Sequence, residues 1–545
     1  MRSRTTIRLL FLVLTATVVF QTGACRRTPA TDQRAIVVAV ENDLVNLDPI
    51  RSQEPYSLRV IGQVFEGLVG LSANNEIIPG LAESWSHNET YDLWTFEIRP
   101  DVYFHEDPAI GPERTRAVDA EDVVFSFQRV VSKDSYPAFV LADALEGVET
   151  FQEDTSAGLS GVRATGPMTV EMALVKPEPS FLHRITSPWF AVYPREVAAL
   201  GPDVFGRSRV AGTGPYRLVS RMDNEVVLAR HERHWQGAPE IERLIFRVIK
   251  NEQIRLSELR NGNVDIMVLP VALAPAVIAG SPSSTGEYPL TRFYRGRFNV
   301  ESFPTFNSHF IGMNCDRLDV HVRRAISLGI NREELLRAVV HGTGAVTAGT
   351  VPVGLLGYQP PYPGDIFDPE EAREALLRSS FRPANDRIEL LVHEKDNSEQ
   401  LGQLVQAQLA RIGITVDLVR LDYNSVVGRM IQGETQAFAL ALEYVFSAPE
   451  PTLNNIFHSD KIPVPNFWRY RNPLVDRGLD DLRLIGDRSL ANELARHVEK
   501  QIIDDAPAAF LYQLHNLVVH RSGISGVSFN GHSIPLFAGL RLDET

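Results

Sequence analysis

Residues 398–418 read SEQLGQLVQAQLARIGITVDL, and their hydrophobic pattern indicates the fold class. Apolar residues recur in its first part at the spacing of one helix face: Leu401, Leu404, Val405, Leu409 and Ile412. Gly413 then ends the helix, and apolar residues alternate along 414–418 as they do in a half-buried strand. A helix that passes through one glycine into a strand is a building block of α/β domains, so we predict a mixed α/β architecture.

Helix start signals recur on both sides of this unit. Asp119 is a favourable N-cap residue with Asp122 at the third helical position, which predicts a capped helix running to about Val131. Comparable starts open the stretches 331–340 (NREELLRAVV) and 368–380 (DPEEAREALLRSS). Strands are predicted where apolar residues alternate or run together, at 35–40, 94–98, 170–174, 244–248 and 414–418.

The N-terminus carries an export signal. Three arginines precede an apolar run from Leu9 to Phe20, and small residues lead to Cys25. This arrangement is typical of a secretory signal peptide, residues 1–24; a bare anchor helix is the alternative, although a bilayer span needs ~20 apolar residues. We expect Cys25 to be lipidated and residues 25–34 to tether a periplasmic or otherwise extracytoplasmic body to the membrane. Thr22 stands where bacterial lipoprotein signals usually carry Leu.

Charge and cysteine content narrow the class of partner. The full chain has a formal net charge of −14, and loss of residues 1–24, whose only charged side chains are arginines, makes it more negative. An acidic body disfavours nucleic acid and anionic lipid headgroups as main partners. Cys25 and Cys315 are the only cysteines. If Cys25 is acylated, the fold forms without a disulfide and Cys315 is a small core or loop residue, not a nucleophile.

Enzyme motifs are missing from the sequence. It has no G-x-S-x-G nucleophile elbow, no Walker A phosphate loop and no H-E-x-x-H zinc motif. His231 and His234 share helical spacing in front of Trp235, but two histidines without a third ligand indicate a surface pair more than a metal site. We therefore expect a binding protein with no catalytic residues, no cofactor and no metal.

Several blocks stand in a fixed order along the chain. Residues 80–108 read GLAESWSHNETYDLWTFEIRPDVYFHEDP, and residues 118–130 read VDAEDVVFSFQRV. Further blocks are NLDPI (46–50), VFEGLVG (64–70), AGTGPYRLVS (211–220), HERHWQGAPEIERLIFRVI (231–249), LRNGNVDI (259–266), VRRAISLGINREELLRAVVHGTG (322–344) and QAQLARIGITVDLV (406–419). Together they closely resemble the family 5 solute-binding proteins of ABC importers, the oligopeptide-, dipeptide- and nickel-binding type, from about Ala35 to the C-terminus.

This resemblance implies a periplasmic-binding-protein-like fold of type II, cluster C. Two lobes would close around a ligand by hinge motion, and a small accessory domain would complete a pear-shaped monomer. The implied limits are 35–70 with 200–290 and 507–545 for lobe I, 71–199 for the accessory domain, and 291–506 for lobe II. The hinge crossings would lie near 286–293 and 507–514, and the protein would deliver its ligand to the permease subunits of an importer.

The resemblance also marks candidate ligand-binding residues. In LALEYVFSAPEPTLNNIF (440–457), Tyr444 stands where peptide-binding relatives typically carry Trp, and Ser447 stands where they carry the Asp that pairs with the peptide's α-ammonium. Ser447 cannot neutralise a buried ammonium, whereas Glu443 or Glu450 offers a carboxylate nearby. The full set of candidate ligand-binding residues is Gln53, Glu54, Tyr56, Tyr444, Ser447 and Glu450.

Three other functions stay open at this point. A metal-chelate binder of the nickel type would use the same fold. An exported hydrolase would need an active site dispersed along the sequence, since no local motif provides one. A receptor subunit would report its ligand to a sensor and never feed a transporter.

Overall fold

The computed structural model describes residues 35–543, apart from residues 281, 284–285, 353–354, 356–357, 363–365 and 395–396. The predicted signal peptide, residues 1–24, and the predicted lipidated tether, residues 25–34 with Cys25, lie outside these described residues. Within the described ranges, no helix has both the length and the apolar character that a bilayer crossing requires.

One large mixed sheet runs through the molecule, and its central strand β20 (Ala508–Arg521) is the longest. The C-terminal half of β20 pairs with β13 and β14, and its N-terminal half pairs with β15 and β16. Along the sheet the order is β10 (Tyr216–Met222), β11 (Glu225–Arg230), β12 (Arg243–Val248), β1 (Ala35–Val40), β13 (Ile266–Val268), β20, β15 (Asn307–Met313), β19 (Ala437–Glu443), β17 (Arg387–His393) and β18 (Thr415–Leu421), with β14 (Phe298–Pro304) and β16 (Gly344–Val346) also on β20.

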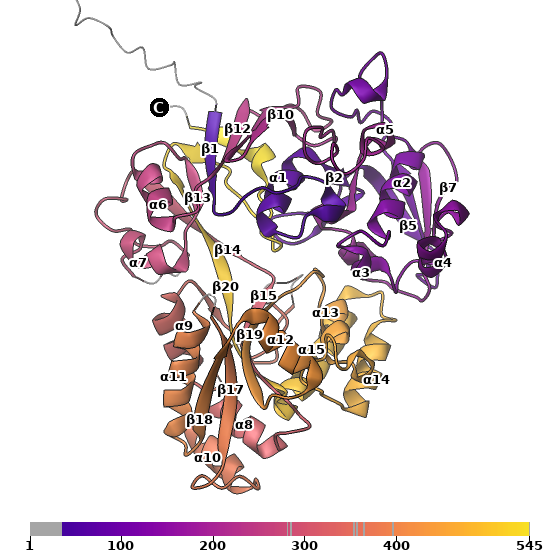
Figure 1. The fold of residues 1–545 in the computed structure, drawn as a ribbon. Helices are drawn as coiled ribbons and strands as arrows, with labels where there is room; N and C mark the ends of the chain where they lie inside the picture. Colours follow the sequence, from indigo (N-terminus) through magenta and orange to yellow (C-terminus); the bar gives the residue numbers. More distant parts are fainter. Residues whose placement is uncertain are drawn as a thin grey trace, which may run out of the picture.

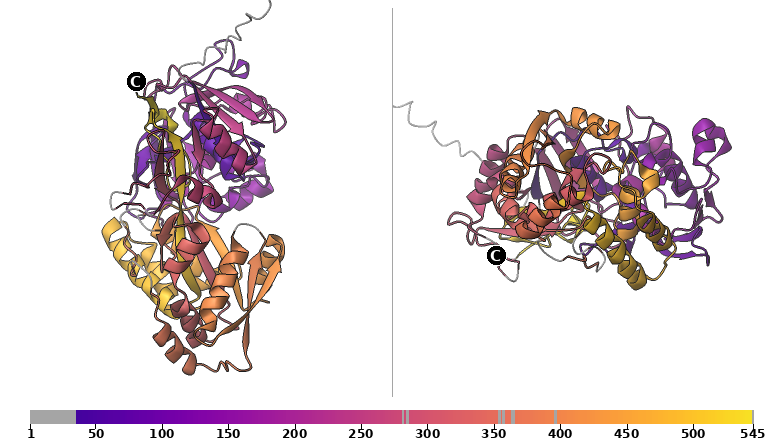
Figure 2. Two further views of the ribbon diagram at one scale, coloured as in Figure 1. Left: turned by 90° about the vertical axis from the view of Figure 1, so that its left-hand side faces the viewer. Right: turned by 90° about the horizontal axis from the view of Figure 1, so that it is seen from below.

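Two bodies lie at the two ends of β20 (Figure 1). The upper body holds β1 and β10–β13 with α1 (Pro55–Val64), α6 (Glu252–Arg260) and α7 (Ala274–Val277). The lower body holds β15 and β17–β19 with α8 (Val320–Gly329), α9 (Arg332–Val340), α10 (Pro369–Leu377), α11 (Ser398–Ala410), α12 (Tyr423–Gln432), α13 (Pro449–Phe457), α14 (Pro473–Leu482) and α15 (Arg488–Asp505). A view turned by 90° about the vertical axis shows the same two bodies one above the other (Figure 2, left).

Two segments cross between the bodies. One is β20, whose partners change from the lower body to the upper body between Tyr512 and His515. The other passes from β14 to β15 through Thr305 and Phe306, so it lies further along the chain than the expected crossing at 286–293. Residues 286–293 lie in the upper body instead, where Ile278 forms a bridge with Leu290.

An accessory region, residues 71–199, lies beside the upper body (Figure 1). It is built on a separate four-stranded sheet in the order β5 (Ala82–His87), β6 (Leu93–Ile98), β8 (Thr169–Ala173) and β7 (Val162–Ala164). Helix α2 (Ala120–Val130) contacts β7 and β8 of this sheet, and the predicted apolar face of α2 is buried at Val123, Phe127 and Val130.

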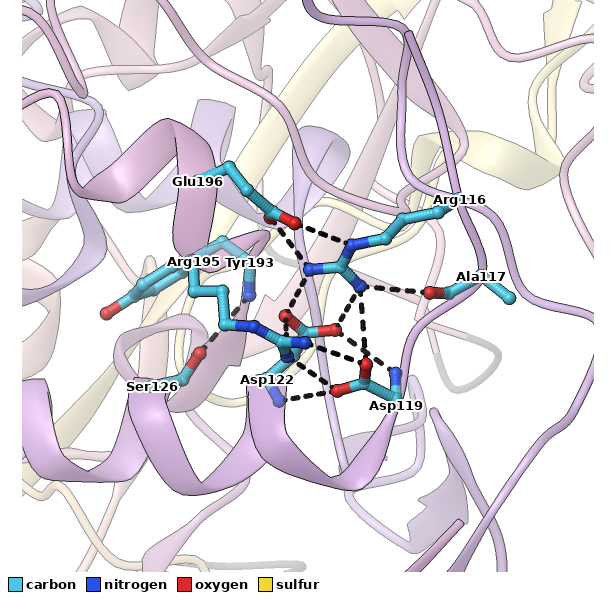
Figure 3. A network of polar contacts seen from close by, with 8 residues as sticks. All are labelled: Arg116, Ala117, Asp119, Asp122, Ser126, Tyr193, Arg195 and Glu196. Atoms are coloured by element: carbon cyan, nitrogen blue, oxygen red, sulfur yellow. Dashed lines mark hydrogen bonds and ion pairs between the residues drawn. The ribbon is translucent and has the colours of Figure 1, made fainter. Parts of the chain in front are cut away.

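The predicted capping box at the start of α2 is confirmed. The Asp119 carboxylate accepts a hydrogen bond from the backbone N–H of Asp122 at 3.0 Å, and the Asp122 carboxylate accepts one from the backbone N–H of Asp119 at 3.1 Å. Arg116 lies 2.6 Å from Asp122 and 2.7 Å from Glu196, and Arg195 lies 2.7 Å from Asp119 (Figure 3). These ion pairs hold the N-terminus of α2 against α5 (Arg195–Ala198).

The helix–glycine–strand unit that set the predicted fold class is also confirmed. Helix α11 buries Leu401, Val405 and Leu409, and full burial of such a side chain contributes about 1.5–3 kcal/mol. Gly413 follows with φ +91°, a conformation that favours glycine, and the chain then enters β18, which pairs in parallel with β17. The helix starts predicted at Asn331 and at 368–380 are confirmed as α9 and α10.

The histidine pair predicted to be at the surface is buried, which corrects that expectation. His231 is 9 % exposed and His234 is 6 % exposed. The ring of His105, from the accessory region, lies 4.8 Å from that of His231, and His234 bonds to Glu66 at 3.2 Å. The reason is a long-range contact: the turn at Gly214 brings His105 against this segment, with its Nε2 2.9 Å from the Gly214 carbonyl.

Candidate functional site: a cleft between the two bodies

A cleft lies between the upper and lower bodies, next to the crossing strands. Its larger cavity measures about 460 Å³ and takes its walls from α1, the end of β19 and the crossing segments. A second cavity of about 440 Å³ adjoins it and shares Val271, Asn307, Glu443 and Leu514 with the first. Pockets of this size with walls from two bodies are typical ligand sites.

The upper wall of the cleft is the start of α1. Pro55 occupies the first helical position, which suits its fixed backbone, and Tyr56 follows it half-buried. Gln53 is exposed just before the helix, and both Gln53 and Tyr56 line the larger cavity. Trp189 lies behind this turn and donates a hydrogen bond from its indole nitrogen to the Ser52 carbonyl at 2.8 Å. The tryptophan therefore fixes the backbone that presents Gln53.

The lower wall of the cleft includes Tyr444, immediately after β19. Its backbone N–H donates to the Phe306 carbonyl at 2.7 Å, which ties it to the crossing segment. Its hydroxyl lies 2.7 Å from the Thr350 hydroxyl, and burial raises the pKa of the phenol. Tyr444 is only 6 % exposed, so it offers the cleft part of an aromatic wall.

The structure does not bring all six candidate residues together. Gln53, Tyr56 and Tyr444 line one cavity, whereas Glu54 is the N-cap residue of α1 and lies outside the linings of the described cavities. Ser447 is fully buried, with its hydroxyl 2.8 Å from His183 Nδ1.

Glu450 also lies away from the cleft. It accepts a hydrogen bond from the Ser180 hydroxyl at 2.5 Å. Ser447 and Glu450 therefore face the accessory region, and their role as ligand contacts stays a prediction.

One of the two carboxylates that the sequence offers in place of the ammonium-pairing Asp lies in the cleft. Glu443 ends β19, is exposed within the cleft, and lines both cavities. Among the described residues its side chain makes no hydrogen bond and no ion pair. Solvent reaches Glu443, but the surrounding cleft walls partly desolvate its carboxylate and so raise its pKa, and the charge of Arg59 counteracts this. Arg59 itself lies 3.3 Å from Glu41 on the upper side of the cleft.

The sequence indicates Glu443 as an alternative carboxylate, although it is not among the six candidate residues. It is the last residue of an apolar strand pattern and directly precedes the aromatic candidate Tyr444, so it lies where the strand meets the cleft. The sequence holds no comparable pattern that would predict the pairing of Arg59 with Glu41, because the positions of these two residues relative to the cleft depend on the fold of the upper body.

Histidines also surround the cleft. His515 and His532 line the larger cavity, and His309 and His393 line the smaller one. Burial lowers the pKa of His309, His515 and His532 to about 4, so these rings are neutral at pH 7. Across the described ranges, no three His, Cys, Asp or Glu side chains are grouped to hold a metal ion.

Cys315 follows β15 and is half-buried. Burial raises the pKa of its thiol to about 11, so it is not a thiolate at neutral pH. This agrees with the expectation of a structural residue.

Comparison with known proteins identifies the family. Residues 76–463 match the model of the bacterial extracellular solute-binding proteins, family 5, middle region. The chain belongs to this family. The family is one of binding proteins, which agrees with the expectation that the protein is not an enzyme.

Relatives match along most of their length. The dipeptide-binding protein of Escherichia coli K12 is 24% identical over 453 residues, covering 80% of this chain and 81% of the relative. HbpA2 from Haemophilus parasuis matches with a TM-score of 0.80 and 24% identity, covering 94% of this chain and 100% of that chain. The unliganded open form of the murein tripeptide-binding protein MppA gives a TM-score of 0.79 at 21% identity, covering 93% and 97%. These matches confirm the predicted mixed α/β, periplasmic-binding-protein-like fold of cluster C.

Proposed function

We propose that the protein captures a peptide or similar small solute in the cleft, outside the cytoplasm, and delivers it to the permease of an ABC importer. The observation that carries this proposal is a cleft whose walls come from two bodies joined by two crossing segments. A ligand that contacts both walls stabilises the closed arrangement, whereas one that contacts a single wall does not.

The chemistry of the walls suits a short polar chain. Tyr56, Trp189 and Tyr444 provide aromatic surface for side chains. Glu443 on the lower wall and Arg59 on the upper wall provide charges of opposite sign for the ends of a zwitterion. A relative named a dipeptide-binding protein supports peptide as the ligand class.

The moving units follow from the same proposal. With the crossing segments at 305–306 and 513–514, the expected limits at 290 and 507 move: residues 35–70, 200–304 and 515–543 would act as lobe I, residues 71–199 as the accessory domain and residues 307–512 as lobe II. The crossings at Thr305 and between Tyr512 and His515 are the places where backbone rotation would close the cleft. A monomer suffices for this mechanism, since both walls belong to one chain.

We also propose that lipidated Cys25 holds the protein at the membrane surface. The N-terminal sequence supports this, through its charged start, short apolar run and small residues before Cys25. Mass spectrometry of the membrane-extracted protein tests it: diacylglycerol on Cys25 is expected, and a Cys25→Ala variant should be released from the membrane.

A metal chelate is the second candidate ligand. The imidazoles of His309 and His393 at the smaller cavity favour it, because a neutral imidazole such as that of His309 can complete the coordination of a chelated metal. Native mass spectrometry of the protein purified without denaturation separates the two. A co-purified peptide supports the first ligand class, a nickel or iron chelate supports the second, and turnover of a substrate would contradict both.

A further inference from the structure

A third cavity lies away from the cleft, between the accessory region and helices α13–α15 of the lower body. It measures about 430 Å³. Both sides contribute walls, and its apolar lining includes Ile77, Pro179, Pro449, Leu482, Ile485 and Ala491. We name it the seam cavity. Tyr444 and Glu443, which mark the cleft, do not line it.

Of the acidic side chains on the wall of the seam cavity, that of Glu450 is the most deeply buried. It lies in the first turn of α13 and is 8 % exposed. One carboxylate oxygen accepts the 2.5 Å hydrogen bond from Ser180, and the other has no donor among the described residues. Burial raises the pKa of Glu450 to about 7, and the nearby charge of Glu178 adds to this effect.

Two arginines carry charge close enough to act on Glu450, but neither forms an ion pair with it. The guanidinium of Arg184 lies 2.5 Å from Glu178 and 3.2 Å from Asp143, and Arg483 lines the wall of the cavity. Among the described residues, Glu450 itself forms no ion pair. A buried carboxylate without its own partner is costly, and a cation entering the cavity would relieve that cost.

We propose that the seam cavity is a second ligand site, for small organic molecules with one primary amine on a compact apolar body. The ammonium would donate a charge-assisted hydrogen bond to Glu450, and the apolar walls would cover the body of the molecule. Arg483 and Arg488 also line the cavity, which disfavours molecules with two or more positive charges.

Benzylamine and its neutral analogue benzyl alcohol test the proposal with the mature, full-length protein. Ligand-observed NMR and calorimetry should show benzylamine binding at least tenfold more tightly than benzyl alcohol. Glu450→Gln should remove this preference. The matched control is Glu443→Gln, which removes the cleft carboxylate and should leave the affinity for benzylamine unchanged. If Glu443→Gln abolishes amine binding and Glu450→Gln does not, the amine occupies the cleft and the proposal is overturned.

A second variant covers the case in which Glu450→Gln does not fold. Ala491 lines the seam cavity from α15 and is half-buried, so Ala491→Leu should fill part of the space. This variant should lose binding of both probes while keeping the circular dichroism spectrum of the wild type. Unchanged benzylamine binding in Ala491→Leu, or equal binding of the two probes by the wild type, would contradict the proposal.

Discussion

The hydroxyl of Tyr444 lies 2.7 Å from the hydroxyl of Thr350, so the aromatic residue of the lower cleft wall is anchored through its polar end. The backbone N–H groups of Thr350 and Val351 in turn donate to Glu499 at 2.7 and 2.8 Å. Glu499 is fully buried, and burial raises its pKa to about 7. The cleft wall is thus supported from beneath by a buried polar network.

This arrangement predicts different effects for two substitutions of Tyr444. Tyr444→Phe removes the hydroxyl alone and should cost about 1 kcal/mol of unfolding free energy, the usual net value of one hydrogen bond, with ligand affinity changed less than threefold. Tyr444→Ala removes the ring, so it should weaken ligand binding at least tenfold and lower stability by about 3–5 kcal/mol. Urea unfolding and calorimetry with the co-purified ligand measure both. Equal affinity in wild type and Tyr444→Ala would show that the ring does not contact the ligand.

Glu443 should determine how tightly the cleft binds a positively charged ligand. Under the proposed function, Glu443→Gln should weaken binding of a dipeptide with a free N-terminus at least tenfold, because the ammonium loses its carboxylate in a partly desolvated cleft. The N-acetylated dipeptide should bind equally to both proteins. Glu54→Gln is the matched control, since Glu54 lies outside the described cavities, and should leave both affinities unchanged. A loss of dipeptide affinity in Glu54→Gln with no loss in Glu443→Gln would contradict the role of Glu443 as the carboxylate that binds the ammonium.

Acid should destabilise the protein through His105. Burial lowers its pKa to about 3, with the nearby His231 adding to the shift, while the unfolded chain takes up a proton near pH 6.5. The unfolded state therefore binds more protons between these values, and His105 alone should cost about 1.4 kcal/mol of stability per pH unit from pH 6.5 downward, added to the contributions of the other buried histidines. His105→Gln should reduce the slope by this share in urea unfolding at pH 7, 6 and 5. An unchanged slope in the variant would assign the acid sensitivity to other groups.

Arg116 should be important for the stability of the accessory region. It is one of two ion-pair partners of Asp122, whose side chain is fully buried; the other is Arg195 at 3.0 Å. Arg116→Ala leaves that carboxylate with Arg195 alone, so it should cost part of the ~3–5 kcal/mol that breaking a buried pair from one side costs. Asp122→Asn in the same background should recover part of the loss, because it removes the incompletely paired charge. Thermal unfolding of the single and double variants measures the changes in stability. If the destabilisations caused by the two substitutions simply add in the double variant, the predicted coupling between Arg116 and Asp122 is contradicted.

Local patterns predicted the helices and strands because each depends on neighbours along the chain. The apolar face of α11 and the turn at Gly413 are set within about fifteen residues, and the capping box of α2 within four. The partners of β20 could not be predicted in this way. Its apolar sequence indicates a strand, but only the three-dimensional fold determines that its two halves pair with different bodies.

The candidate site residues also differ in whether local sequence or only the three-dimensional fold determines their position. Tyr444 lies at the cleft as the resemblance implied, because it directly follows a strand of the central sheet. Ser447 and Glu450 face the accessory region, where His183 and Ser180 bond to them. Contacts separated by more than 260 residues leave no local signal in the sequence.

Closure of the two bodies around the ligand can be measured by small-angle X-ray scattering of the mature protein, with and without the ligand recovered from its native purification. The radius of gyration should be smaller with ligand, because the two bodies rotate about β14–β15 and β20 to enclose it. An unchanged radius of gyration while calorimetry shows full occupancy would contradict closure of the cleft as the basis of binding.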